Sequence, residues 1–90
     1  MYFKTRNRRS DMNHKEMPLN RLPLGARAKV SSLRASGPAR RRMLDLGIVS
    51  GTPIEPLYKS PSGNPVAYLI RGAVIALRSD VSDKILVTAS

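Results

Sequence analysis

The residues that could perform chemistry are few and scattered along this 90-residue chain. There is one histidine, His14, and no cysteine, and the carboxylates Asp45, Glu55, Asp80 and Asp83 do not form a motif. A metal ion needs several N, O or S ligands that converge on one point, and covalent catalysis needs a nucleophile beside a base. The sequence therefore predicts no metal site and no enzyme activity, and it gives no reason to expect a cofactor or a small-molecule substrate.

Positive charge is the strongest chemical signal. The chain has sixteen Lys/Arg and six Asp/Glu, which gives a net charge of +10. Three of the arginines are consecutive: Arg40, Arg41 and Arg42. Such a charge favours acidic or phosphate-bearing partners without choosing between them. In a helix, however, three successive side chains point in different directions, so they cannot form one flat basic face. We interpret this run as the solvated side of a helix; contact of Arg40 and Arg41 with an acidic partner or with phosphate is the alternative.

Composition divides the chain into a tail and a domain. Residues 1–17 hold five Lys/Arg, two acids and few aliphatic side chains, which is too little apolar surface to order a segment. Residues 18–90 hold the other eleven Lys/Arg and four acids, together with the apolar pattern of one small domain. No apolar run approaches the roughly 20 residues of a membrane helix, and no signal-peptide pattern is present. We therefore predict a cytoplasmic protein.

Alternation of apolar and polar residues predicts a mainly β domain. The expected strands lie within residues 26–33, 51–60, 64–72, 73–78 and 85–88. Glycine and proline punctuate the chain between them, and the "PSGN" connection at 61–64 suits a hairpin. Pro56 cannot donate to a ladder, so its strand should be an edge or carry a bulge.

One segment has the period of a helix. Pro38 suits its first turn, and Gly47 suits a left-handed stop at its end. Three apolar residues form a single stripe along it: Ala39, Met43 and Leu46. Met43 and Leu46 are therefore predicted to lie in the core. Leu44 lies at the edge of the stripe, where a partly exposed leucine can anchor a partner.

Several short motifs, taken in order, resemble the FeoA family, ferrous iron transport protein A, over residues 19–88. They are Gly25 before the first strand, "RRRMLDLG" at 40–47 followed by "SGT" at 50–52, "SPSGNP" at 60–65, "RG" at 71–72 and "ALR" at 76–78. The resemblance implies an SH3-like barrel of about five strands, with one short helix inserted after the first strand. We expect five glycines of these motifs to be structural: Gly25, Gly47, Gly51, Gly63 and Gly72.

The resemblance also implies a function. Members of the family are small accessory proteins of ferrous iron uptake that bind and regulate FeoB, a membrane GTPase transporter, and transition-metal-ion binding is associated with them. The alternative function is a small basic barrel that contacts nucleic-acid phosphates. The net charge favours that alternative, but the interleaved aromatics on which single-stranded bases stack are missing, so nucleic acid is the less expected partner.

An apolar patch is predicted where this chain differs from the family pattern. Alternation along residues 64–72 turns Ala67 and Leu69 outward, where the family commonly carries charged residues. Such a patch would serve weak self-association or the docking of a partner, and scattered surface aliphatics are the alternative. The predicted partner-binding residues are Leu57, Leu69 and Val74 on this patch, with Arg40, Arg41 and Leu44 on the helix.

Overall fold

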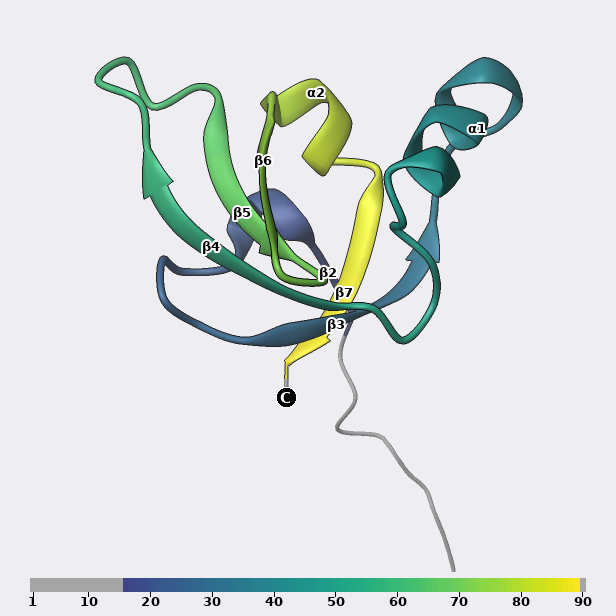
Figure 1. Ribbon diagram of the computed structural model, residues 1–90, viewed down its shortest axis with the longest axis horizontal. Helices are drawn as coiled ribbons and strands as arrows, with labels where there is room; N and C mark the ends of the chain where they lie inside the picture. The colour runs from purple at the N-terminus through teal and green to yellow at the C-terminus, as the bar shows by residue number, and fades with distance from the viewer. Residues whose placement is uncertain (1–15, 90) are drawn as a thin grey trace, which may run out of the picture.

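The computed structural model describes residues 16–89, and β-strand is the main regular secondary structure of that part of the chain. The strands are β2 (Met17–Pro18), β3 (Ala28–Leu33), β4 (Pro53–Lys59), β5 (Val66–Ile70), β6 (Ala73–Leu77) and β7 (Ile85–Ala89). They form one strongly curved antiparallel sheet in the order β2-β7-β3-β4-β5-β6 (Figure 1). The mainly β prediction is confirmed. The predicted tail lies outside the described residues, apart from Glu16 and Met17.

In the described part of the chain, three short helices connect the strands. The 3-10 helix η2 (Leu19–Arg21) follows β2, and the one-turn helix α2 (Ser79–Ser82) joins β6 to β7. The predicted helix is α1 (Gly37–Asp45), between β3 and β4, with Pro38 in its first turn. It stands at one side of the barrel, across from the β4–β5 loop (Figure 1). None of the helices within residues 16–89 has the length and apolar character needed to cross a membrane.

The core lies on the concave face of the sheet. Its most completely buried apolar residues come from η2, the loop after α1 and four of the strands: Leu19, Val30, Ile48, Ile54, Tyr68, Ile70, Ile85 and Val87. β-branched and aromatic side chains dominate this set, and such residues pack well on a pleated surface. Tyr68 is the largest of them, and its burial raises the pKa of its phenol, while a hydrogen bond with the Ser82 side chain acts in the opposite direction.

Strand β4 carries a bulge. Its register against β5 shifts between Pro56 and Tyr58, so Leu57 is the extra residue. The strand is not an edge, because β3 pairs with it on the other side. The Pro56 carbonyl accepts a hydrogen bond from the Gly25 N–H at 2.8 Å. Of the two outcomes expected for Pro56, the structure has the bulge.

Helix α1 ends at the left-handed turn of Gly47, as predicted. The Gly47 N–H donates to Leu44 O and the Ile48 N–H to Met43 O, at 2.9 and 3.0 Å, and Gly47 has φ +86°. This is a Schellman motif, in which the residue after the left-handed glycine packs against the last turn. Ile48 is therefore fully buried beside Met43, and Leu46 stays 39% exposed. The prediction that Leu46 lies in the core is wrong.

Ala67 faces outward as predicted, but the exposure expected for it in the apolar patch is wrong. It shares the outer face of the sheet with its direct cross-strand partners Tyr58 and Ala76, yet it is buried. A small side chain on an interior strand is covered by its larger neighbours, so pointing outward does not make it accessible.

Candidate partner-binding surfaces

The helix residues predicted to meet a partner lie at the surface. Arg40 and Arg41 are exposed, and Leu44 is 38% exposed. Between two described residues, the only ion pair is the one between Arg27 and Glu55, at 3.5 Å. The helix therefore presents basic side chains together with an apolar one, a combination that suits an acidic partner with an apolar anchor.

The sheet residues predicted to form a patch are partly brought together. Leu69 and Val74 are direct cross-strand partners on β5 and β6, a position in which the Cβ atoms lie about 4.5–5.5 Å apart. Val74 is 58% exposed and Tyr58, in the next row, is 60% exposed, while Leu69 is half-buried. We call Tyr58, Leu69, Val74 and Ala76 the outer patch. Leu57 lies in the bulge, half-buried, outside the paired rows.

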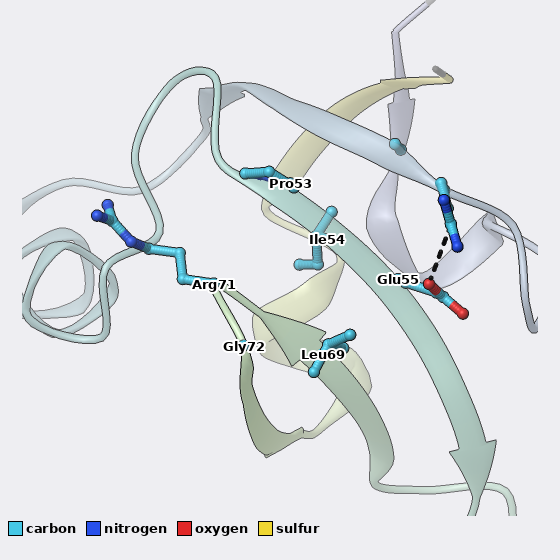
Figure 2. Close-up of a pocket in the computed structure, with 8 residues that line it drawn as sticks. Pro53, Ile54, Glu55, Leu69, Arg71 and Gly72 are labelled. Carbon is cyan, nitrogen blue, oxygen red and sulfur yellow. Dashed lines mark ion pairs between the residues drawn. The ribbon is translucent and has the colours of Figure 1, made fainter.

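A hollow of about 340 Å³ lies beside Leu69. Its lining residues are Arg27, Ala28, Pro53, Ile54, Glu55, Leu69, Arg71 and Gly72. Figure 2 shows the ion pair with Glu55 at one side of this hollow, and Arg71 extending away from Leu69. The Arg27 side chain is 82% exposed, so the pair contributes little to stability. The hollow has few converging polar groups, and we assign it no ligand.

Arg71 connects the β5–β6 turn to the end of α1. It is the one non-glycine residue with positive φ in the described chain, at +53°, followed by Gly72 at +85°. Two such residues make the tight two-residue hairpin turn. A Cβ added to Gly47 would lie 3.2 Å from the Arg71 Cδ. The stem of Arg71 thus lies over Gly47, which must lack a side chain there.

A larger groove of about 620 Å³ separates α1 from β6 and α2. Its lining residues are Pro38, Ala39, Arg42, Met43, Leu46, Ile75, Ala76, Leu77, Arg78, Asp80 and Val81. We call it the α1–β6 groove. The apolar stripe of α1 therefore exists as predicted, but it lines an open groove instead of a sealed core.

Sequence analysis missed this groove. Several of its lining residues had been singled out, but for other roles: Met43 and Leu46 as core, and Arg42 as part of the solvated side of the helix. A signal was available in "AVIAL" at 73–77, a strand with no charge and no proline. An uncharged strand of this kind indicates a binding edge only if it lies at the end of the sheet. Its place in the sheet depends on long-range strand pairing, which the sequence pattern does not give.

Metal ligands do not gather in the described chain. Within residues 16–89, no group of three or more His, Cys, Asp or Glu side chains is placed to hold a metal ion. The residues present there do not fit a transition-metal centre.

Comparison with known proteins identifies the family. The FeoA domain model matches residues 17–89. Among solved structures, FeoA from Chlorobium tepidum is 34% identical, with a TM-score of 0.75, and the match covers 81% of this chain and 70% of that one. A FeoA-like protein from Clostridium acetobutylicum is 35% identical, with a TM-score of 0.77 and coverage of 83% and 87%.

A third relative adds a description of the fold. The zinc complex of FeoA from Stenotrophomonas maltophilia is 31% identical, with a TM-score of 0.71 and coverage of 79% and 88%; it is described as a prokaryotic SH3 domain protein. The IdeR protein of T. acidophilum shares only the fold, at 20% identity and a TM-score of 0.72, over 34% of its length. No curated protein matches the chain. The expected SH3-like fold is confirmed, and the chain belongs to the FeoA domain family.

Proposed function

We propose that this protein is an accessory of ferrous iron uptake that acts in the cytoplasm by binding a FeoB-type membrane GTPase transporter and regulating it. The family match over residues 17–89 carries the proposal. The Stenotrophomonas relative is described as a candidate activating factor of ferrous iron transport. An accessory of this kind acts by binding another protein, so it needs surfaces more than a catalytic centre.

The helix surface is the proposed contact with the transporter. Arg40, Arg41 and Leu44 lie on one short element that makes few tertiary contacts, and Leu44 is accessible. Partly exposed apolar and arginine side chains are typical anchors at interfaces. The outer patch, with Leu69 and Val74, is the second proposed contact surface.

The test is a binding assay with the transporter of the same organism in lipid nanodiscs. Leu44→Glu should weaken binding of the full chain at least about tenfold, since anchor residues contribute about 2 kcal/mol or more. Leu24→Glu is the matched control, because Leu24 is 49% exposed in a loop before β3, and it should bind like the parent. Absence of binding by the parent, or equal loss in both variants, would contradict the proposal.

The same material tests the nucleic-acid alternative. If the parent instead retains nucleic acid, with an affinity that falls steeply with salt, and if only the triple change Arg40/Arg41/Arg42→Glu abolishes it, the arginines bind phosphate.

A further inference from the structure

Strand β6 has an open outer edge. Among the strands of residues 16–89, it ends the sheet and pairs only with β5. Ile70 and Ala73 flank the two-residue turn and form a hydrogen-bonded pair. From this pair onward, hydrogen-bonded and non-hydrogen-bonded residue pairs alternate along β5 and β6. The N–H and C=O groups of Val74 and Ala76 consequently point away from β5. Within residues 16–89, no backbone or side-chain group forms a hydrogen bond with these four groups.

The α1–β6 groove lies along this edge. Ile75, Ala76 and Leu77 line one wall, and Ala39, Met43 and Leu46 of α1 line the other. A strand added to β6 would form backbone hydrogen bonds with one wall and apolar side-chain contacts with the other. Peptide recognition by strand addition combines these two kinds of contact.

The charge at the groove selects the occupant. Arg42 and Arg78 line it, with Asp80 as the only lining carboxylate. Lys84 brings a third cation to this rim, because its Nζ donates to the Asp80 backbone carbonyl at 3.0 Å. An occupant with acidic side chains is therefore favoured over a neutral or basic one.

Two other occupants are disfavoured by the same charges. The fifteen residues before the described part carry five Lys/Arg and one acid, the same sign as the groove. In a second copy, antiparallel pairing of β6 with β6 about Ile75 would bring Arg71 of one copy near Arg78 of the other. Like charges opposed in this way are destabilising.

We propose that the α1–β6 groove captures an extended acidic segment of another protein, which adds as a strand to the outer edge of β6. The segment alternates apolar residues, which contact the apolar stripe of α1, with acidic residues on its opposite face, which contact Arg78 at the end of β6. This inference does not require the partner to be the transporter, so its failure and that of the proposed function are separate results.

The experiment uses a nine-residue capped peptide that alternates valine with glutamate. It is titrated into the ¹⁵N-labelled full chain at low salt, and amide shifts are followed. Saturable shifts are expected at 74–78 and along α1, with a Kd below about 1 mM. The absence of saturable shifts would overturn the proposal, and so would equal binding of a peptide with lysine in place of glutamate.

N-methylated peptides test the strand addition itself. Successive N–H groups of an extended peptide point to opposite edges, so methylating either the valines or the glutamates blocks one edge and keeps every side chain. One of the two peptides should bind at least about tenfold more weakly, as expected for lost backbone hydrogen bonds. If both bind like the unmodified peptide, the groove recognises side chains only and the proposal is wrong.

A protein variant tests the other side of the contact. Ala76→Pro removes an N–H that the β5–β6 ladder does not use, and proline is tolerated at such an edge position. It should bind the peptide about tenfold more weakly, while Ala76→Ser, which keeps the N–H, should bind like the parent. If the parent chain sediments as a dimer and Ala76→Pro is a monomer, the β6 edge binds a second copy of this chain, and the proposal is wrong.

Discussion

The two edges of the sheet are built differently. β2 is two residues long and contains Pro18, which has no N–H for a further strand, and the chain then passes directly to the fully buried Leu19. β6 is five residues long, all apolar, with no proline and no charge. Native proteins usually protect edges with short strands, prolines or lysines. Within residues 16–89, the first edge continues directly into the core, whereas the second edge has no strand paired to it, which makes β6 the edge suited to a partner.

The largest expected effect is a difference in the free energy of unfolding between variants at the two edges. Leu19→Ala, next to β2, should lower the free energy of unfolding by about 2–5 kcal/mol, because it opens a cavity in the core. Val74→Ala on β6 should change it by less than about 0.5 kcal/mol, because the side chain is 58% exposed. Urea denaturation measures both. Similar losses in the two variants would mean that β6 is as structural as β2.

A smaller effect concerns the link between the open edge and α1. Gly47→Ala should cost about 1–2 kcal/mol for its left-handed backbone, with a further loss from the contact of its Cβ with the Arg71 Cδ at 3.2 Å. Gly51→Ala, at φ +90° with nothing within 4 Å of the added Cβ, should lose only the stability that the left-handed backbone conformation costs.

Thermal unfolding compares the two glycine variants. Arg71→Ala in the Gly47→Ala background should recover the difference between them. If the two glycine variants lose the same stability, Arg71 does not hold the β5–β6 turn against α1, and the groove walls are joined only through the sheet.

The smallest expected effect tests the inner face of the hairpin that carries the open edge. Tyr68 lies opposite Ile75 of β6, and burial raises its pKa above the ordinary value of 10.0. Above pH 10 the unfolded chain loses this proton while the folded chain still holds it, so stability falls as the pH rises. Tyr68→Phe should reduce the fall in Tm between pH 9 and 11.

The matched control for this effect is Tyr58→Phe. Tyr58 is 60% exposed on the outer patch, so its replacement should leave the parent's alkaline slope in Tm unchanged. If the dependence of Tm on alkaline pH is unchanged in the Tyr68→Phe variant, burial of Tyr68 does not raise its pKa as expected.

Local patterns predicted most of the elements. Alternation placed the strands, Gly47 marked the end of α1, and Pro56 signalled the bulge in β4. Each of these features is decided by a few neighbouring residues, through side-chain period, backbone angle or a missing donor. The family resemblance supplied the SH3-like barrel and the place of the helix after its first strand, which no single pattern contains.

Burial was harder to predict where it depends on distant packing. The i, i+4, i+7 stripe of α1 was real, but Ile48 took the core position expected for Leu46 once the left-handed turn redirected the chain. Ala67 was covered by neighbours on two other strands. The α1–β6 groove could not be predicted, because it forms where the sheet fails to close, and only long-range pairing decides that.

The loop after α1 closes on itself. The Thr52 hydroxyl donates to Gly47 O at 3.1 Å and accepts from the Val49 N–H at 3.2 Å, while the Gly51 N–H donates to Val30 O at 2.7 Å. The loop is therefore fastened to β3 independently of the helix before it. For protein engineering, this makes α1 a graftable cassette, whose exposed face can be resurfaced or exchanged for another helix while the barrel keeps its own connections.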